Sequence, residues 1–545
     1  MADQKQLEEA HPREGESRRG AQGTRRSRVD GRVLEEAHPR EGESRRGAQG
    51  TRRSRVDGRV LEEASPREGE SRRGAQGTRR SRVDGRVLEE APPREGESRR
   101  GAQGARRSRV DGRVLEAWDD AHLWHPFTPH AVYRDEQPLL IERGEGHDLI
   151  DVDGNRYLDG VASIWCNTFG HRHDKIDAAI RAQLDRIAHA TLLGHATVPS
   201  VQLAKRLADL APDPLTKVFY SDNGSTAVEI ALKMTYQYWQ QVGETKRTRF
   251  LAFDAAYNGD TIGAVSVGGI DLFHRIFHPM LFDVLRAPSP YGQPEASLTA
   301  LAELFDRHEG EIGALVIEPG FQGAGGILPL PNGFLAEAVQ IAKNHGTLVV
   351  FDEVAVGMGR SGAMFCCERE GVTPDFLCIA KGLTAGYLPL AATLTTQTVF
   401  DAFVAPPGDK KTFFHGHTYT GNALGCAAAL ATLDVFEQEG VLDALPAKVE
   451  HLASAARRLA GKPGVQDVRS YGLAAGIELG RPDGPFDPND RTGIRVCLRA
   501  RDKGVFLRPL GDVLVIMPPL TVSTEEIDRI VDAIAYGLES VEDGG

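Results

Sequence analysis

Two acidic residues and one lysine stand directly after short apolar runs in the middle of the chain. Asp352 and Glu353 follow the run Val349–Phe351, and Lys381 follows a second apolar stretch at 376–380. Runs of this kind are typical of buried strands, so both charged groups are expected where strands leave a core. A carboxylate can hold a pyridine nitrogen protonated, and a lysine can form a Schiff base with an aldehyde. Together these residues indicate a pyridoxal phosphate enzyme.

Each of these residues also has an ordinary structural interpretation. Asp352 could instead pair with Arg360, because an unpaired buried carboxylate is costly. Lys381 could be a surface lysine after a strand, although lysine is rarely buried without a role. If the strand continues, Glu353 points away from Asp352, and Glu318 at the end of another apolar run is a further candidate acid.

A possible phosphate site lies at residues 222–226, between a short strand and a long helical stretch. Backbone amides at a helix N-terminus, here with Gly224 and Ser225, suit an anion such as phosphate. Ordinary helix capping is the common alternative. Tyr257 ends another apolar run and could stack on a flat cofactor ring, with Gly259 letting the backbone pass closely. A half-buried tyrosine in a surface turn is the plain alternative.

Two C-terminal segments supply further candidates. His415 and His417 are two residues apart, but no third ligand has suitable spacing, so no metal site is expected. A hydroxyl near a helix that begins around Asn422 fits a phosphate better, and Thr418 is the candidate. Arg508 could bind a substrate carboxylate through two parallel hydrogen bonds, or be a surface charge on an edge strand.

The elements that must position these residues alternate between apolar runs and helical stretches. Turn residues at 153–155 predict a hairpin or meander over 137–160. Helical periodicity predicts helices over 173–190, 199–211 and 221–239. Strands are predicted at 217–220, 250–253, 264–267, 314–318, 347–351, 376–380 and 390–395. The pattern favours the α/β class, with a mostly parallel sheet covered by helices on both faces, followed from about 437 by a smaller α+β domain.

The composition divides the 545-residue chain in two. Residues 7–114 are four copies of a 27-residue unit, which begin at Leu7, Leu34, Leu61 and Leu88. Each copy is rich in Arg, Glu and Gly and poor in apolar residues, so residues 1–114 are expected to be disordered and not a solenoid. The formal net charge is −12 although the repeats are basic. The rest is therefore strongly acidic, which argues against a nucleic-acid substrate, and an Arg-rich nucleic-acid arm is the weaker alternative.

Targeting and redox signals favour a cytoplasmic enzyme. No stretch reaches the ~18 apolar residues that cross a membrane, and the repeats lack the apolar core of a secretory signal. The six cysteines include no Cys-x-x-Cys pair, so reduced thiols are expected.

Residues from about 118 to 540 resemble the fold-type I, class III aminotransferases. The resemblance is carried by DEVAVGMGRSG, which begins at Asp352, with Lys381 placed 29 residues later. Four more segments, 123–130, 163–173, 415–429 and 508–519, resemble the 8-amino-7-oxononanoate (KAPA) aminotransferases of biotin synthesis, also called 7,8-diaminopelargonic acid synthases. The resemblance implies conversion of KAPA to 7,8-diaminononanoate. Other class III ω-aminotransferases, of the ornithine, 4-aminobutyrate or β-alanine type, are the alternative.

The resemblance also implies an architecture and a set of residue roles. It implies a large cofactor domain over 162–436 with a seven-stranded sheet, a small domain from 115–161 and 437–545, and a homodimer with shared sites. The implied roles are Lys381 as Schiff-base and proton-shuttling residue, Asp352 on the pyridinium, Gly224 and Ser225 on the phosphate, Tyr257 on the ring face, Thr418 on the partner's phosphate, and Arg508 on the KAPA carboxylate.

The remaining pocket positions bear on the amino donor. Phe127, Ile164, Trp165 and Gly416 are expected to contact substrate. Members that use S-adenosylmethionine have Tyr where this chain has Phe127, and a Trp pair in place of Ile164-Trp165, which changes polarity and shape. Residues 187–199 and 415–422 resemble the branch that uses lysine. The sequence therefore places L-lysine ahead of S-adenosylmethionine.

Overall fold

The structure, a computed structural model, describes residues 82–83, 86–87 and 111–542. The chain divides into two units, Met1–Gln103 and Gly104–Gly545. In the first unit, β1 (Arg82–Val83) pairs antiparallel with β2 (Arg86–Val87). The other residues of the predicted disordered tail lie outside the described part, except that Asp111 caps helix α1 (Gly112–His122) and 112–114 begin it.

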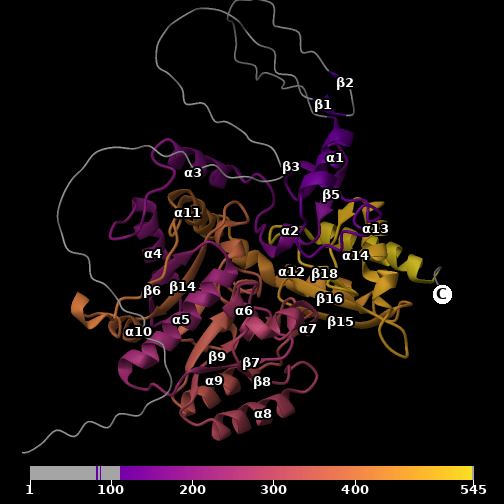
Figure 1. The fold of residues 1–545 in the computed structure, drawn as a ribbon. Coiled ribbons are helices and arrows are strands. Elements are labelled where there is room, and N and C mark those ends of the chain that lie inside the picture. Colours follow the sequence, from indigo (N-terminus) through magenta and orange to yellow (C-terminus); the bar gives the residue numbers. More distant parts are fainter. Residues whose placement is uncertain (1–81, 84–85, 88–110, 543–545) are drawn as a thin grey trace, which may run out of the picture. The chain divides into compact units, whose positions relative to one another are not determined.

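A seven-stranded sheet forms the centre of the second unit (Figure 1). In spatial order its strands are β6 (Leu215–Ser221), β14 (Ala391–Thr396), β13 (Phe376–Ile379), β12 (Leu348–Asp352), β9 (Ile312–Ile317), β7 (Arg249–Phe253) and β8 (Val284–Ala287). Only β14 runs antiparallel to its neighbours. The predicted mostly parallel sheet is therefore confirmed.

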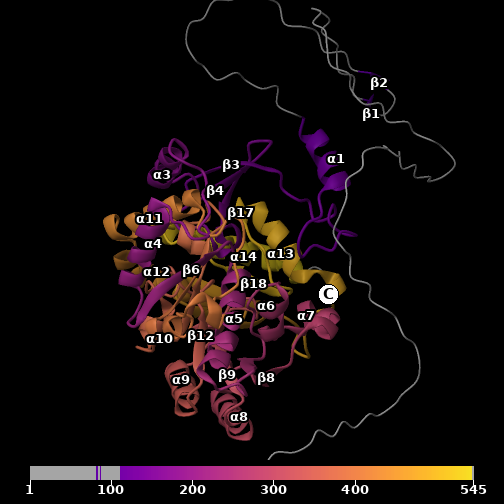
Figure 2. The same cartoon turned by 60° about the vertical axis from the view of Figure 1, so that its left-hand side comes forward.

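Helices cover both faces of this sheet, because its strands alternate apolar side chains between two cores. Phe250 and Ala252 belong to a core shared with α5 (Gly224–Val242) and α6 (Ile262–Val267). Leu251 and Phe253 belong to the opposite core. That core is shared with α3 (Asp174–Leu184), α4 (Val198–Leu210), α8 (Pro294–Arg307), α9 (Phe334–Asn344) and α11 (Ala423–Gln438). Figure 2 shows α8 and α9 together at one end of the sheet and α3, α4 and α11 at the other.

One predicted strand is wrong. Residues 264–267 belong to helix α6, and the seventh strand is β8. Three buried apolar residues and one buried serine fit either structure, so periodicity could not decide. The helix is capped from outside itself: Glu229 accepts the amide of Gly263 at 2.6 Å, and Arg286 donates to the carbonyl of Ser266 at 2.8 Å. These partners come from α5 and β8, and the local sequence does not reveal them.

Short elements connect the main ones. They are α2 (Ala162–Trp165), α7 (Asp271–His274), η1 (Arg275–Met280), β10 (Phe321–Gln322), β11 (Leu328–Pro329), η2 (Cys366–Arg369), η3 (Lys381–Thr384), α10 (Gln397–Asp401), η4 (Pro407–Asp409) and η5 (Pro488–Asp490).

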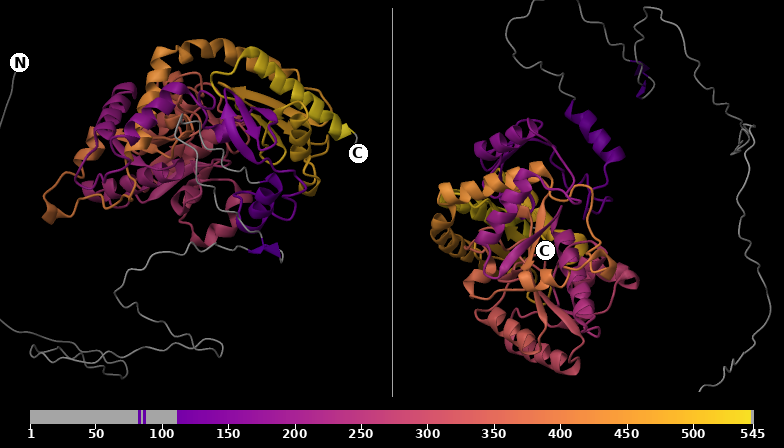
Figure 3. Two further views of the ribbon diagram at one scale, coloured as in Figure 1. Left: turned by 90° about the horizontal axis from the view of Figure 1, so that it is seen from above. Right: turned by 90° about the vertical axis from the view of Figure 1, so that its left-hand side faces the viewer.

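Both ends of the described part contribute to one further sheet. The predicted meander is confirmed as β3 (Ile141–Glu145), β4 (Asp148–Asp151) and β5 (Arg156–Asp159), and β5 pairs in parallel with β17 (Val505–Phe506). Figure 3 shows the purple N-terminal strands beside the yellow C-terminal elements. A three-stranded sheet of β15 (Val465–Tyr471), β16 (Ala474–Leu479) and β18 (Val513–Ile516) lies with helices α12 (Val441–Arg457), α13 (Thr492–Arg501) and α14 (Thr524–Glu542).

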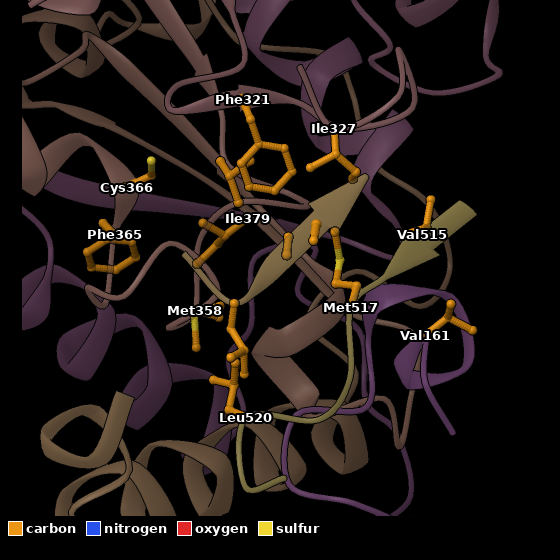
Figure 4. Packing of buried hydrophobic residues seen from close by; sticks show 14 of the residues in the cluster. Val161, Phe321, Ile327, Met358, Phe365, Cys366, Ile379, Val515, Met517 and Leu520 are labelled. Carbon is orange, nitrogen blue, oxygen red and sulfur yellow. The ribbon is translucent and has the colours of Figure 1, made fainter. Parts of the chain in front are cut away.

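An apolar cluster joins the C-terminal sheet to the loops of the large sheet (Figure 4). Val515 and Met517 come from β18 and the residues after it, and Phe321 and Ile327 come from the segment after β9. All four side chains are buried, so this contact fixes the C-terminal elements against the strand ends. No helix in the described residues is both long and apolar enough to cross a membrane.

Candidate active site

Asp352 ends β12 on the face of the sheet that carries α5. Leu348 and Val350 face the α5 core, and alternation places Asp352 on the same side. The side chain is only 4% exposed, and one carboxylate oxygen accepts the amide of Val354 at 3.0 Å. Burial raises the pKa of Asp352 to about 6, partly opposed by that amide and by Lys381. Its other oxygen accepts no hydrogen bond from any residue that the structure describes.

The alternative partner of Asp352 is engaged elsewhere. Arg360 donates to the carbonyls of Leu473 at 2.9 Å and Pro518 at 2.7 Å. Glu353 points to the opposite side, as strand alternation predicts, and accepts the amides of Cys366 at 2.6 Å and Cys367 at 2.8 Å. Glu353 therefore holds the turn at 366–367, whereas Asp352 faces the site.

Lys381 is turned into the site by an unusual backbone. β13 ends at Ile379, Ala380 has neither helical nor strand geometry, and Lys381 has φ = 43°. Few residues other than glycine adopt this region, and such strain is concentrated at functional sites. The Nζ of Lys381 lies 4.8 Å from the ring centroid of Trp165. Burial lowers the pKa of Lys381, and Asp352 opposes this effect.

The N-terminus of α5 presents free amides to the same space. Asn223 caps the helix and forms a capping box with Thr226, which leaves the amides of Gly224 and Ser225 without helical partners. A Cβ at Gly224 would lie 2.5 Å from Val354 Cγ1, so only glycine fits there. Ordinary capping is therefore present through Asn223 and Thr226, and it leaves the amides of Gly224 and Ser225 available for an anion.

The loop after β7 is tied to this helix start and to a buried acid. Ser225 Oγ accepts the amide of Asp260 at 3.1 Å, and the Tyr257 hydroxyl donates to Asp260 at 2.7 Å. Glu318 accepts the amides of Tyr257 at 3.0 Å and Gly323 at 2.9 Å. Burial, and then the charge of Asp352, raise the pKa of Glu318 to about 8. Glu318 thus fixes the Tyr257 backbone beneath the site.

These groups line one cavity of about 430 Å³. Its lining includes Trp165, Gly224, Ser225, Tyr257, Glu318, Asp352 and Lys381. The residues fit pyridoxal phosphate on three counts: a buried carboxylate with an unused oxygen for the ring nitrogen, unpaired helix-start amides for the phosphate, and a buried lysine with a lowered pKa. The volume is within the range of small-molecule sites.

The buried acids give the cofactor-free protein a specific pH dependence. Glu318 has a folded pKa of about 8 against 4.5 in water, so the folded state binds its proton more tightly and loses stability as the pH rises between these values. In Glu318→Gln this loss is absent. We expect the free energy of unfolding of the variant, relative to wild type, to rise by on the order of 4 kcal/mol from pH 5 to pH 8. Urea unfolding at several pH values measures this; a constant difference would contradict a raised pKa.

Five of the predicted contact residues lie outside the cavity lining. Gly416 and Thr418 are exposed in the segment before α11, and Asn422, without a hydroxyl, caps that helix. Arg508 is exposed, and Phe127 and Ile164 are 57% and 49% exposed. The amide oxygen of Asn422 caps this helix by accepting from residues 424 and 425, and the role of the Thr418 hydroxyl toward a phosphate stays a prediction.

The cavity also contains residues that the sequence did not single out. Cys166 follows the turn that carries Trp165, and burial raises its pKa. Asn258 adjoins Tyr257, and its buried side-chain oxygen Oδ1 has no hydrogen-bond partner among the described residues. Thr384 and Tyr387 follow Lys381. Proximity in the sequence to Tyr257 and Lys381 was the available signal for the last three.

Comparison with known proteins identifies the family. The class III aminotransferase family matches residues 130–538. This chain belongs to the class III aminotransferases. The aminotransferases of this class use pyridoxal phosphate, in agreement with the cavity around Lys381 and Asp352.

The aminotransferase part of this chain aligns with nearly the whole length of two curated relatives. A protein of Geobacter sulfurreducens named adenosylmethionine-8-amino-7-oxononanoate aminotransferase is 51% identical over 442 residues, which are 78% of this chain and 98% of the relative. A protein of the same name from Aquifex aeolicus is 47% identical over 78% of this chain and 97% of the relative.

Solved structures agree with the aminotransferase fold. The structure of adenosylmethionine-8-amino-7-oxononanoate aminotransferase from Methanocaldococcus jannaschii matches with a TM-score of 0.77 and 44% identity, over 79% of this chain and 99% of that one. A PLP-bound amine transaminase from an uncultivated Pseudomonas species matches with a TM-score of 0.73 and 36% identity, over 77% and 98% of the two chains.

Proposed function

We propose that this aminotransferase converts 8-amino-7-oxononanoate to 7,8-diaminononanoate in biotin synthesis, with S-adenosylmethionine as amino donor. The observation that supports this substrate is the 51% identity to a relative named adenosylmethionine-8-amino-7-oxononanoate aminotransferase, over 98% of that relative's length. The Lys381–Asp352 site supplies the chemistry that such a transfer needs. An ornithine, 4-aminobutyrate or β-alanine aminotransferase finds no support among these relatives.

The residues of the cavity divide the work of holding the cofactor. The amides of Gly224 and Ser225 are placed for the phosphate, the free oxygen of Asp352 for the ring nitrogen, and the ring of Tyr257 for one face of the cofactor. When bound, pyridoxal phosphate supplies an aldehyde that takes up the amino group and a protonated ring that accepts electron density. Asp352 keeps that ring nitrogen protonated.

Lys381 is suited to move the proton. Its lowered pKa leaves more of the amine neutral near pH 7, so Nζ can remove a proton from the carbon that bears the amino group and later return one. Trp165 over Nζ and the burial of the strand ends exclude water from this base. The same site serves both substrates in turn, so ping-pong kinetics are expected.

Aromatic residues extend from the cavity toward the N-terminal segment. Phe273 lies 6.3 Å from Tyr257 and 5.4 Å from Phe127, both edge to face. An apolar wall of this kind suits the alkyl chain of KAPA. Arg508 makes no hydrogen bond or ion pair with another described residue, so its guanidinium is available for the substrate carboxylate.

We further propose a cytoplasmic homodimer. Thr418 and Gly416 are exposed beside the apolar side chains of Phe414 and Tyr419, as expected of a segment that reaches a second subunit. All six cysteines are free, in keeping with a reducing compartment. Sedimentation equilibrium tests the dimer; a monomer at micromolar concentration that is fully active would contradict shared sites.

L-Lysine remains the second candidate donor. The names of the relatives favour S-adenosylmethionine, which reverses the order that the sequence suggested. The residues that favour lysine are Phe127 and Ile164; both are exposed, and the Phe127 ring packs edge to face on Phe273.

Incubation of purified protein with KAPA and one donor at a time decides between them. We expect 7,8-diaminononanoate with S-adenosylmethionine at a kcat/KM at least about tenfold above that with L-lysine. Mass spectrometry of the diamine measures both rates, with KAPA alone as the blank. Product formation with lysine only would overturn the proposed donor and leave the proposed acceptor intact.

A further inference from the structure

The short turn α2, which carries Ile164 and Trp165, has a strained backbone. Ala162, Ser163 and Trp165 have φ values of 46°, 63° and 65°, and none of them is glycine. The dihedrals inside the turn are not helical. Such conformations cost free energy and persist only where surrounding contacts over-determine them. Some specific group must therefore hold this turn.

Besides the backbone bonds from Trp165 to Val161 and from Cys166 to Ala162, the side chain that holds the turn is the carboxylate of Asp159. Its side chain is 0% exposed, and both oxygens accept the amide of Ser163, at 2.9 and 2.8 Å. The second oxygen also accepts the Ser163 hydroxyl at 3.0 Å and Nε2 of His171 at 3.1 Å. Asn167 in turn donates to Nδ1 of His171 at 2.8 Å. The carboxylate thus has donors on both oxygens and joins the two ends of the segment 163–171.

The start of the turn is fixed independently of Asp159. Gly160 donates to the carbonyl of Phe506 at 3.0 Å and accepts the amide of Met517 at 2.9 Å. The side chain of Val161 is buried in the apolar cluster of Figure 4. Loss of the Asp159 contacts therefore leaves residues 160–161 in place, and only the strained residues after them are free to relax.

Trp165 and Cys166 of this segment form part of the cavity wall. The ring of Trp165 lies over Nζ of Lys381, and Thr168 contacts the Lys381 loop through the carbonyl of Gly382 at 3.4 Å. Ile164, beside Trp165, is exposed. A turn that relaxes would move Trp165 away from Lys381 and reshape the place where substrates enter.

We propose that Asp159, with His171, is a positioning residue that sets substrate recognition by holding the strained turn 162–165 against Lys381. This inference rests on the proposed function for its substrate. It assigns to Asp159 no contact with the reacting atoms. The effect therefore falls on substrate recognition more than on the rate of the bound complex.

Asp151 provides a matched control in the same meander. It is buried and accepts the amides of Asp153 at 3.0 Å and Asn155 at 2.8 Å, but that turn contributes nothing to the cavity lining. We expect Asp159→Ala to raise the KM for KAPA about tenfold with kcat lowered less than about threefold. Asp159→Asn, which keeps an acceptor oxygen, restores most of the wild-type KM. Asp151→Ala loses thermal stability and keeps the KM.

A second variant and a second measurement keep the inference testable if Asp159→Ala does not fold. Ser163→Ala removes one donor only and is expected to raise the KM about threefold. In cofactor-free protein, the emission of Trp165, obtained by subtracting the matching Trp165→Phe variant, becomes more accessible to acrylamide in Asp159→Ala and Ser163→Ala but not in Asp151→Ala.

Equal KM values and equal quenching in the Asp159, Ser163 and Asp151 variants would overturn the positioning role. The quenching needs no substrate, so it separates this inference from the proposed function. If wild type does not consume KAPA but the Trp165 emission responds as expected, the proposed function fails and the positioning role stands.

Discussion

Lys381→Ala is expected to lower turnover by about 10⁴-fold or more while the protein stays folded and soluble. No other group in the described cavity lining can replace this amine. Burial raises the pKa of Cys166 and of Tyr257, so the deprotonated forms that could act as bases are scarce near pH 7. Burial of the charged Lys381 side chain costs free energy. Its replacement by alanine is therefore not expected to destabilise the fold.

A second partly buried lysine serves as the control. Lys448 also has a pKa lowered by burial, but it donates to the carbonyl of Leu520 at 2.9 Å, away from the cavity. Lys448→Ala is expected to lose stability and keep its turnover. Steady-state rates and the absorbance band of cofactor bonded to Lys381 are measured for both variants. Turnover by Lys381→Ala within tenfold of wild type would remove Lys381 from the centre of the site.

Asp352→Asn is expected to lower kcat by about 10³-fold and to make the cofactor-free protein more stable. The pKa of Asp352 is about 6 when folded against 3.8 in water. A raised acid pKa means that the folded state binds the proton more tightly, so the protein loses stability as the pH rises from about 3.8 to about 6, and the loss is complete above that. At pH 8 this cost is up to about 3 kcal/mol, and the neutral amide of the variant avoids it. Cofactor binding offsets the same cost in wild type, so the variant gains less stability from added cofactor.

Glu353→Gln separates the two neighbouring acids. Glu353 accepts the amides of Cys366 and Cys367, and a glutamine offers only one oxygen for them. Burial raises the pKa of Glu353 to about 7, so at pH 5 no cost of ionisation is relieved, and there we expect this variant to lose about 1–3 kcal/mol of stability with little change in kcat. Chemical unfolding with and without cofactor, together with kcat, measures both variants. An Asp352→Asn protein that is less stable than wild type and equally active would contradict the assigned role.

The strand ends could be predicted because their chemistry is local. Apolar runs followed by Asp352 and Lys381 are legible in the sequence, and strand alternation correctly separated Asp352 from Glu353. Residues 264–267 were predicted as a strand but form helix α6. The local sequence could not show this, because the groups that cap the helix, Glu229 and Arg286, lie on other elements.

The mouth of the site depended on tertiary contacts that no local pattern encodes. Trp165 lies over Lys381 in a turn with positive φ values, and the carboxylate of Asp159 contacts that turn at Ser163 and also pairs with His171. Arg508 and Thr418 were candidates from the sequence whose specific roles came from the resemblance, and the cavity of a single described chain does not include them. Their roles remain proposals that concern substrate and a second subunit.

A single turnover tests the central claim most directly, because it needs no amino donor. Protein loaded with pyridoxamine phosphate is mixed with an equal amount of KAPA, and the diamine is measured by mass spectrometry, with Lys381→Ala as the control. The account predicts about one 7,8-diaminononanoate per wild-type site and none from the variant within the same time. Wild-type protein that forms no diamine, yet transfers its amino group to pyruvate or 2-oxoglutarate, would contradict the proposed function.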